Sequence, residues 1–241
     1  MSLIDPRAII DPSARLADDV VVGPWSIVGA DVEIGEGTVI GPHVVLKGPT
    51  VIGKHNRIYQ FSSVGEDTPD LKYKGEATRL VIGDHNTIRE GVTIHRGTVQ
   101  DRSETTIGNH NLIMAYAHVA HDCTIGNNCI LGNSVQIAGH VVIDDWAIIS
   151  GTTAVHQFSR IGSHVMVSGG SLVRKDIPPF TTAGREPLSF CGINSVGLRR
   201  RGFSNEKINE IQDIYRYIYF RGLNHSKAIE LILAETPHSD E

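Results

Sequence analysis

An aliphatic residue returns at every sixth position through most of the chain. The series runs from Ile4 to Val64, from Ile82 to Ile94 and from Ile107 to Val173, and each of its 26 members is Ile, Leu or Val. A period of six that persists over so many units does not match the 3.6-residue repeat of a helix. The pattern therefore predicts a solenoid built from hexapeptide repeats.

Each unit is predicted to be a short strand followed by a corner. The fifth position is often small or β-branched, as at Ala117 and Cys123, and stands two residues before the next aliphatic residue, so both face the same side of a strand. The second position is often glycine, as at Gly23 and Gly126, which suits a sharp turn of the backbone where a side chain would clash. Three such strands close a coil, and stacked coils about 4.8 Å apart would form a prism roughly 40 Å long.

Two interruptions break the repeat and are predicted to project as loops. They span residues 66–81 and 100–106. The repeat ends at Ile177-Pro178, because proline cannot donate to a sheet ladder. A loop rich in Gly and Pro then leads to a helix predicted after Ser204 and a second, short helix over 226–234. We expect two domains, a β-helix over 1–178 and a connecting loop with a helical appendage over 179–241.

Composition narrows the class of protein. The chain has 40% hydrophobic and 20% charged residues and a net charge of −5, so no basic excess indicates binding to nucleic acid. Three cysteines without a CxxC pair suit a reducing compartment, and no stretch approaches the ~20 apolar residues of a membrane span. The opening residues lack the apolar core of a signal peptide. We expect a cytoplasmic protein without a transmembrane segment.

The 18-residue length of a coil predicts which histidines lie on the same face of the solenoid. Units that begin at Val119, Ile137 and Val155 are 18 residues apart and should stack on one face, with the unit at Ile94 one coil below. The long loop should emerge on the same side. This side then gathers several candidate site residues: Asp70, Lys72, His95, His118, His121, Asp122, Gly139, His140, His156 and Gln157. Other histidines, such as His55 and His85, are expected to be solvated corner residues.

Two chemistries compete for the stacked histidines. Neutral imidazoles bind Zn²⁺, as in hydratases with three histidine ligands. Alternatively, one imidazole serves as a general base, because its ordinary pKa is close to neutral pH. For the second chemistry, Asp122 would hold His121 in one tautomer, and the backbone N–H of Gly139 would stabilise an oxyanion. The run Arg199 to Arg201 offers guanidinium groups that match phosphate oxygens.

Several segments resemble a known family, the UDP-N-acetylglucosamine O-acyltransferases. They are Asp70-Leu-Lys72, Ile94-His-Arg-Gly-Thr98, His118-Val-Ala-His-Asp122, Ala138-Gly-His140, Val155-His-Gln-Phe158 and Gly197-Leu-Arg-Arg-Arg201. The resemblance implies a mainly β fold, a left-handed parallel β-helix with a small C-terminal α-helical appendage. It also implies transfer of an (R)-3-hydroxyacyl chain from acyl carrier protein to the 3-hydroxyl of UDP-N-acetylglucosamine, the first step of lipid A synthesis. The family works as a homotrimer with sites between subunits.

The resemblance also assigns roles to residues. His121 is the general base, Asp122 orients it and Gly139 supplies the oxyanion donor. Three further groups match substrate-binding positions of the family. The first lies near His121 and consists of Asp70, Lys72, His95, His118, His140, His156 and Gln157. Gly169 matches the position that limits acyl length, and Asn194, Arg200 and Arg201 match positions that bind the nucleotide. No metal or other cofactor is implied.

Three other functions stay open. An N-acyltransferase of the same pathway shares the fold but usually carries an additional N-terminal domain. A metal-dependent hydratase would place Zn²⁺ on the stacked histidines. A scaffold without catalysis would leave the alignment of the histidines unexplained.

Overall fold

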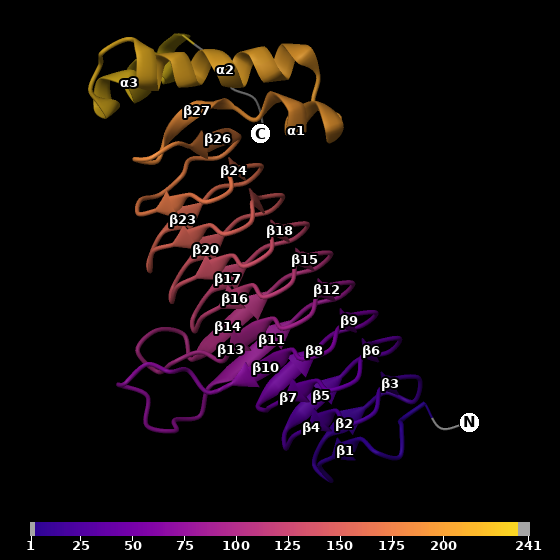
Figure 1. The fold of residues 1–241 in the computed structure, drawn as a ribbon. Helices are drawn as coiled ribbons and strands as arrows, with labels where there is room; N and C mark the ends of the chain where they lie inside the picture. The colour runs from indigo at the N-terminus through magenta and orange to yellow at the C-terminus, as the bar shows by residue number, and fades with distance from the viewer. Residues whose placement is uncertain (1–2, 236–241) are drawn as a thin grey trace.

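The computed structural model describes residues 3–235, and they form a three-sided β-helix closed by helices at its C-terminal end (Figure 1). Three sheets of nine, eight and ten strands make the sides. The first sheet contains, in spatial order, β1 (Ile9–Ile10), β4 (Ile27–Val28), β7 (Val45–Leu46), β10 (Ser63–Glu66), β13 (Thr93–His95), β16 (His118–Val119), β19 (Gln136–Ile137), β22 (Ala154–Val155) and β25 (Leu172–Val173).

The other two sides follow the same order. The second sheet contains β2 (Arg15–Leu16), β5 (Val32–Ile34), β8 (Thr50–Ile52), β11 (Arg79–Ile82), β14 (Glu104–Ile107), β17 (Thr124–Ile125), β20 (Val142–Ile143) and β23 (Arg160–Ile161). The third contains β3 (Val21–Val22), β6 (Val39–Ile40), β9 (Arg57–Ile58), β12 (Thr87–Ile88), β15 (Leu112–Ile113), β18 (Ile130–Leu131), β21 (Ile148–Ile149), β24 (Met166–Val167), β26 (Thr181–Gly184) and β27 (Ser189–Ile193).

The aliphatic repeat forms the core, as predicted. Val119 pairs with Ile137, and Ile137 with Val155, in parallel register from coil to coil. These side chains point inward and are at most 2% exposed, and the small fifth-position residues Ala117 and Cys123 are equally buried. Each coil alone has no core. Stacking therefore supplies both the hydrogen-bonded ladder and the continuous apolar interior.

The corners turn at the third and fourth positions of each unit, where His121 and Asp122 were expected to lie. The left-handed backbone falls at the fourth position of the unit, for example at Asp122 (φ 59°) and His140 (φ 62°). The second-position glycines do not have this left-handed backbone, but the clash expected for a side chain there is confirmed. A Cβ atom on Gly23 would lie 2.7 Å from the carbonyl carbon of Gly41 in the next coil. Glycine at this position thus allows backbones of successive coils to approach closely.

Two loops project from one edge of the prism, next to β10, β13 and β14 (Figure 1). They follow β10 and β13 and span residues 67–78 and 96–103. Both differ in extent from the predicted loops. β11 already begins at Arg79 and β14 at Glu104, because Arg79 pairs with Glu104 across the two strands and extends the ladder.

The C-terminal part contains more regular structure than the pattern indicated. β26 continues the third sheet and forms an antiparallel pair with β27, and α1 (Ser195–Arg200) follows; all three lie in the predicted loop. The two predicted helices are present as α2 (Asn205–Phe220) and α3 (His225–Glu235). Ser204 caps α2 and accepts a hydrogen bond from the Lys207 N–H at 3.2 Å.

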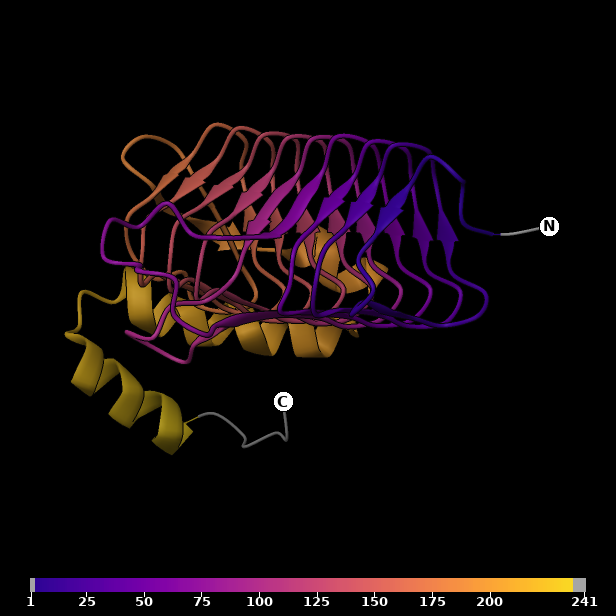
Figure 2. The ribbon, with the colours of Figure 1, turned by 90° about the horizontal axis from the view of Figure 1, so that it is seen from below.

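A second hydrophobic cluster attaches this region to the prism. It contains Leu198, Ile208, Ile211 and Tyr215, and α2 lies across the last coil (Figures 1 and 2). The Tyr215 hydroxyl donates to the Pro179 carbonyl at 2.6 Å. Because β26 extends the third sheet beyond residue 178, the division into domains 1–178 and 179–241 stays a prediction. Within residues 3–235, none of the helices has the length and apolar run needed to cross a bilayer.

Candidate active site

The corners that join the first sheet to the second carry most of the predicted site; we call them the histidine edge, which includes His121 and His140. His121 and Gly139 occupy the same corner position in successive coils. A Cβ atom on Gly139 would lie 2.6 Å from Cε1 and 2.7 Å from Nε2 of His121. The His140 N–H donates to the His121 carbonyl at 3.1 Å. The predicted meeting of His121 with Gly139 is therefore present, and any larger residue at 139 would displace the imidazole.

Asp122 fixes the orientation of the His121 imidazole through a hydrogen bond. The carboxylate is fully buried, and its Oδ2 lies 2.8 Å from His121 Nδ1. Thr98 supports it, because its N–H donates to Oδ1 at 2.9 Å and its hydroxyl to Oδ2 at 2.6 Å. Burial raises the pKa of Asp122, but the hydrogen bonds from His121 and Thr98 and the charge of His140 outweigh burial and lower it. Asp122 is thus ionised at neutral pH and keeps the His121 proton on Nδ1.

His95 lies one coil below His121, and His118 lies in β16, the strand that leads to His121. Both imidazoles are neutral at pH 7. Their rings meet edge to face, 4.9 Å apart. Burial, followed by the charges of His95 and His121, lowers the pKa of His118 to about 4. Burial also lowers the pKa of His95, whose Nδ1 has no hydrogen-bond partner among residues 3–235. His118 Nδ1 pairs with the Thr93 hydroxyl at 2.7 Å. These two rings can exchange hydrogen bonds with a ligand but cannot supply positive charge.

The upper part of the histidine edge is more open. His140 stacks on Phe158, with ring centroids 4.5 Å apart, and its Nδ1 lies 3.0 Å from Asp101 Oδ2. His156 and Gln157 stand exposed one coil above, where His156 Nδ1 donates to the Gln157 carbonyl at 3.0 Å. Both therefore border the site without contacting the His121 dyad.

The long loop carries Asp70 and Lys72 away from the prism. Asp70 accepts a hydrogen bond from the Lys72 N–H at 2.9 Å, and no contact among the described residues joins either side chain to the histidines. The loop is attached through Arg96, which is 7% exposed and donates to the Gly65 carbonyl and the Asp67 carboxylate. The structure thus places Asp70, which is half-buried, and Lys72, which is exposed, in the loop at the same edge of the prism.

The remaining predicted residues lie elsewhere in the chain. Gly169 follows β24, at the corner between the third and first sheets. Arg201 lies at the corners between the second and third sheets, which we call the arginine edge; there it donates to the Trp146 carbonyl at 3.0 Å and meets His164 Nδ1 at 3.4 Å. Arg200 is exposed. Asn194 caps α1 and donates to the His164 carbonyl at 2.9 Å, so both ends of its amide are engaged. One chain therefore keeps the histidine and arginine groups on different edges.

The donor set at His121 also tests the zinc hypothesis. One ligand atom each of His121, Asp122 and His140 lies within 4.8 Å of the others, a spacing compatible with a metal ion. Both oxygens of Asp122 already accept hydrogen bonds from Thr98, and Oδ2 also accepts one from His121. A metal ligated by Asp122 would have to replace this buried network. The arrangement favours acid–base chemistry, since each contact orients a proton.

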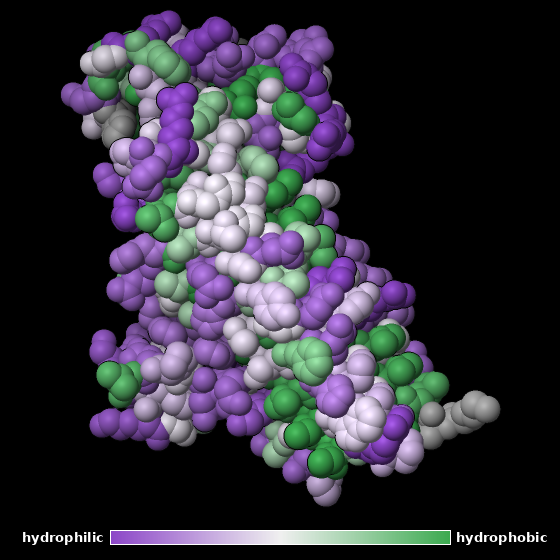
Figure 3. Space-filling model, viewed as in Figure 1, coloured by the Kyte–Doolittle hydropathy of each residue, from purple (hydrophilic) through white to green (hydrophobic). Residues whose placement is uncertain are grey.

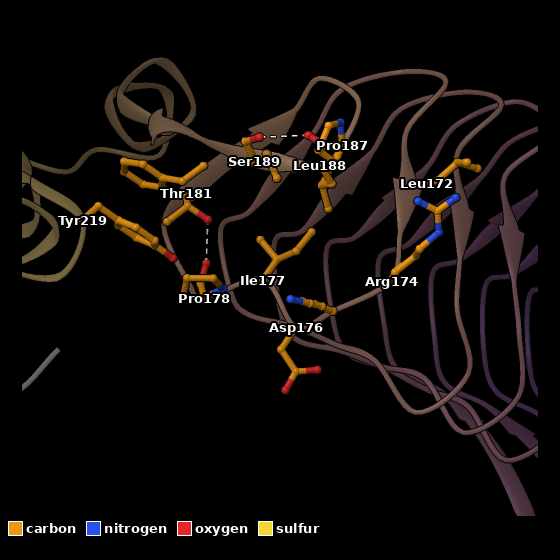
Figure 4. A pocket seen from close by; sticks show the side chains of 13 residues that line it. Leu172, Arg174, Asp176, Ile177, Pro178, Thr181, Pro187, Leu188, Ser189 and Tyr219 are labelled. Carbon is orange, nitrogen blue, oxygen red and sulfur yellow. Dashed lines mark hydrogen bonds between the residues drawn. The ribbon is translucent and has the colours of Figure 1, made fainter. Parts of the chain in front are cut away.

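A pocket of about 700 Å³ opens at the C-terminal end of the β-helix, between β25, β27 and α2 (Figure 4). Apolar side chains such as Leu172, Ile177 and Leu188 line it, with Arg174 at one side and Tyr219 at the other. None of the predicted site residues contributes to its wall. The candidate chemistry therefore lies on the open histidine edge and outside this pocket.

Three residues of the site were not singled out by the repeat pattern: Thr98, Asp101 and Phe158. Thr98 and Asp101 belong to the second loop, which the pattern marked only as a break. The sequence does contain a signal for these two residues: the repeat breaks directly after the unit that carries His95, so the inserted residues should lie near the stacked histidines.

Comparison with known proteins decides among the families that share this architecture. The family described as Udp N-acetylglucosamine O-acyltransferase, Domain 2, matches residues 176–241, and bacterial transferase hexapeptide (six repeats) matches residues 13–48, 31–66 and 104–139. The acyl-[acyl-carrier-protein]–UDP-N-acetylglucosamine O-acyltransferase of Ectopseudomonas mendocina (strain ymp) is 72% identical over 229 residues, covering 95% of this chain and 89% of that protein. This chain belongs to that O-acyltransferase family.

Solved structures of UDP-N-acetylglucosamine acyltransferases agree with this assignment. The enzyme of Francisella novicida superposes with a TM-score of 0.94 at 44% identity, covering 96% of this chain and 85% of that chain. The enzyme of Bacteroides fragilis 9343 gives 0.96 at 47% identity, covering 98% and 92%. The left-handed parallel β-helix expected for the O-acyltransferase is thereby confirmed, and the chain is an enzyme of acyl transfer.

Proposed function

We propose that this O-acyltransferase moves an (R)-3-hydroxyacyl chain from the thioester of acyl carrier protein to the 3-hydroxyl of UDP-N-acetylglucosamine, the first step of lipid A synthesis. The observation that carries the assignment of the site is the His121–Asp122 dyad facing Gly139. The imidazole is held by a buried, ionised carboxylate at 2.8 Å, and its Nε2 edge lies against a glycine backbone. This is the arrangement of an oriented general base beside an oxyanion donor.

The reaction follows from these contacts. His121 Nε2 takes the proton of the sugar hydroxyl while the sugar oxygen attacks the thioester carbonyl. The carbonyl oxygen becomes negative and accepts a hydrogen bond from the Gly139 N–H, which donates no other hydrogen bond within residues 3–235. As the C–S bond breaks, the imidazolium returns its proton to the departing thiolate. The products are the ester and the free thiol of the carrier, and no cofactor is needed.

We further propose that the enzyme is a homotrimer with each site shared by two chains. Two features support this. One chain keeps the histidine edge apart from Gly169, Asn194, Arg200 and Arg201, so a neighbouring subunit has to supply the second group. The outer face of the third sheet also carries a stripe of partly exposed aliphatic residues, a surface suited to a subunit or an acyl chain. The stripe consists of Leu112, Ile130, Ile148 and Met166.

The other residues predicted to bind substrate can be assigned to parts of the same site. His95, His118, His140, His156, Gln157, Asp70 and Lys72 would surround the sugar and the thioester, while Arg200 and Arg201 of the neighbouring subunit would hold the diphosphate. We place the enzyme in the cytoplasm. Its three cysteines are free thiols, and the buried Cys123 and Cys129 donate to main-chain carbonyls within the core.

The test is an assay of the purified protein with UDP-N-acetylglucosamine and carrier-linked 3-hydroxyacyl chains of graded length. Product mass reports transfer and chain preference, and alkali lability distinguishes an ester from an amide. His121→Ala should reduce turnover by ~10²–10⁴-fold, the range of general base catalysis, while a cooperative thermal transition shows that the protein stays folded. Turnover of this variant at the wild-type rate would remove His121 from the role of base.

A further inference from the structure

We propose that Asp101, in the loop over residues 96–103, is a positioning residue that fixes the ring of His140, so that the site uses two carboxylate–imidazole pairs. Asp122 serves His121, and Asp101 serves His140. The inference rests on the proposed function, because it concerns how His140 meets the substrate. Its direct evidence is the 3.0 Å contact between Asp101 Oδ2 and His140 Nδ1.

Asp122 cannot serve both imidazoles. Its Oδ2 lies 2.8 Å from His121 Nδ1 but 4.0 Å from His140 Nδ1, which is beyond hydrogen-bond distance. Thr98 donates to both oxygens, so Oδ2 already accepts two hydrogen bonds, one from Thr98 and one from His121. His140 therefore needs a separate acceptor, and the second loop provides it.

The loop is built to place that acceptor. Its turn closes on Thr98, whose carbonyl accepts the Ser103 N–H at 3.0 Å and the Asp101 N–H at 3.4 Å. On its other side, Arg102 donates to the Asp122 carbonyl at 3.2 Å and contacts the Thr124 hydroxyl. The same threonine thus anchors one carboxylate and sets the turn that presents the other.

The ring of His140 is held on its second side as well. Phe158 stacks on it at 4.5 Å with an angle of 11° between the planes, while the ring of His121 stands perpendicular to it at 5.0 Å. With Nδ1–H donating to Asp101, only Nε2 remains for the substrate. Asp101 therefore decides which nitrogen of His140 faces the ligand.

The experiment compares Asp101→Ala and Asp101→Asn with Gln100→Ala, a change of the exposed residue beside Asp101. Asparagine still accepts the Nδ1–H bond through its side-chain oxygen, whereas alanine removes it. We expect Asp101→Ala to raise KM for UDP-N-acetylglucosamine about 10-fold, the loss typical of one hydrogen bond, with a smaller change in kcat. Asp101→Asn should retain most of the affinity, and Gln100→Ala should behave as wild type.

The second measurement is independent of turnover. Ring ¹⁵N shifts of His140, assigned with His140→Gln, should show a proton fixed on Nδ1 in the wild type and in Asp101→Asn, and a mixture of tautomers in Asp101→Ala. Unchanged ring shifts in Asp101→Ala, or a KM equal to that of Gln100→Ala, would overturn the proposal. If the wild type itself transfers no acyl chain, the proposed function fails, while the ring shifts still decide the role of Asp101.

Discussion

The reactivity of His121 depends on which ring nitrogen carries its proton. Asp122 decides this by accepting Nδ1–H, which leaves Nε2 against Gly139. The carboxylate stays ionised although it is buried, because Thr98 adds two donors to its oxygens. At the scale of single residues, the site is therefore a chain of obligatory hydrogen bonds, and two changes test it.

Gly139→Ala should abolish most turnover by pushing the imidazole away. The new Cβ would lie 2.6 Å from His121 Cε1, a distance that the ring can relieve only by rotating off its position. We expect a loss of at least about 10²-fold in kcat, as for removal of one oxyanion donor. Steady-state kinetics and thermal unfolding of Gly139→Ala and of the double variant with His121→Ala check this. If the clash is the cause, the double variant is at least as stable as Gly139→Ala; a fully active Gly139→Ala would contradict the geometry.

His118 should make the enzyme less stable in mild acid. Its pKa is lowered from 6.5 to about 4 by burial and by the neighbouring histidines. Between these values the unfolded chain binds a proton that the folded chain does not. The free energy of unfolding is therefore not reduced by His118 above pH 6.5. It decreases as the pH falls from 6.5 toward 4, at a slope of at most about 1.4 kcal/mol per pH unit.

The measurement is urea unfolding at several pH values in that window, for wild type and His118→Gln, which keeps a partner for Thr93. The variant should show a shallower dependence of unfolding free energy on pH. Identical slopes for the two proteins would mean that His118 titrates normally in the folded state.

Corners of the β-helix act as elements in their own right. The left-handed fourth residue turns the chain, so neighbouring third and fourth side chains escape strict strand alternation and His121 and Asp122 can meet. The same geometry stacks exposed rings from coil to coil, as at His55, His85 and His110, whose centroids are 4.9 and 4.8 Å apart. These corner histidines are exposed, as expected, but they form a column at the coil spacing.

The long loop depends on one buried cation, so Arg96→Ala should release it. The variant leaves Asp67 and the Tyr73 hydroxyl without the guanidinium of Arg96, which stands at the start of the second loop, directly after β13. We expect trypsin to cleave after Lys72 or Lys74 about 10-fold faster, because the loop opens locally more often. Arg79→Ala, which removes a solvent-exposed ion pair with Glu104, is the matched control and should cleave at the wild-type rate. Equal rates for both variants would show that Arg96 does not anchor the loop.

On the scale of the whole molecule, apolar side chains are exposed on more than one side of the prism. Hydrophobic residues gather on the surface of the first coils (Figure 3). Ile9 and Ile27, neighbours in the first sheet, are 63% and 40% exposed, and Val39 of the third sheet is 37% exposed. The aliphatic stripe of the third sheet lies between the arginine edge and the corner of Gly169. A rigid prism cannot bend one edge onto another, so a site that needs both groups requires a second chain.

Complementation tests this assembly. His121→Ala and Arg201→Ala should each be inactive as homotrimers. In trimers formed from equal amounts of both chains, about a quarter of the sites between subunits would combine an intact His121 with an intact Arg201, so co-expression should restore about that fraction of activity. Analytical ultracentrifugation checks the trimer. Absence of restored activity in verified mixed trimers would place both groups within one chain.

Much of the fold could be predicted from the spacing of residues along the chain. The six-residue period specifies strand, corner and inward residue together, and the 18-residue coil brings His121, Gly139 and Gln157 onto one edge without any long-range information. Ser204 and the helical spacing after it likewise predicted α2, because caps and amphipathic faces are local signals.

The residues that hydrogen-bond the candidate catalytic side chains could not be predicted from the repeat. Thr98 meets Asp122 across 24 residues and Asp101 meets His140 across 39, distances that the interrupted repeat does not encode. The β26–β27 pair and α1 also form without a periodic signal, since their partners lie in the last coil and in α2. Regular repetition set the positions of the candidate catalytic residues, whereas the folding of irregular insertions back onto the prism decided which hydrogen bonds hold them.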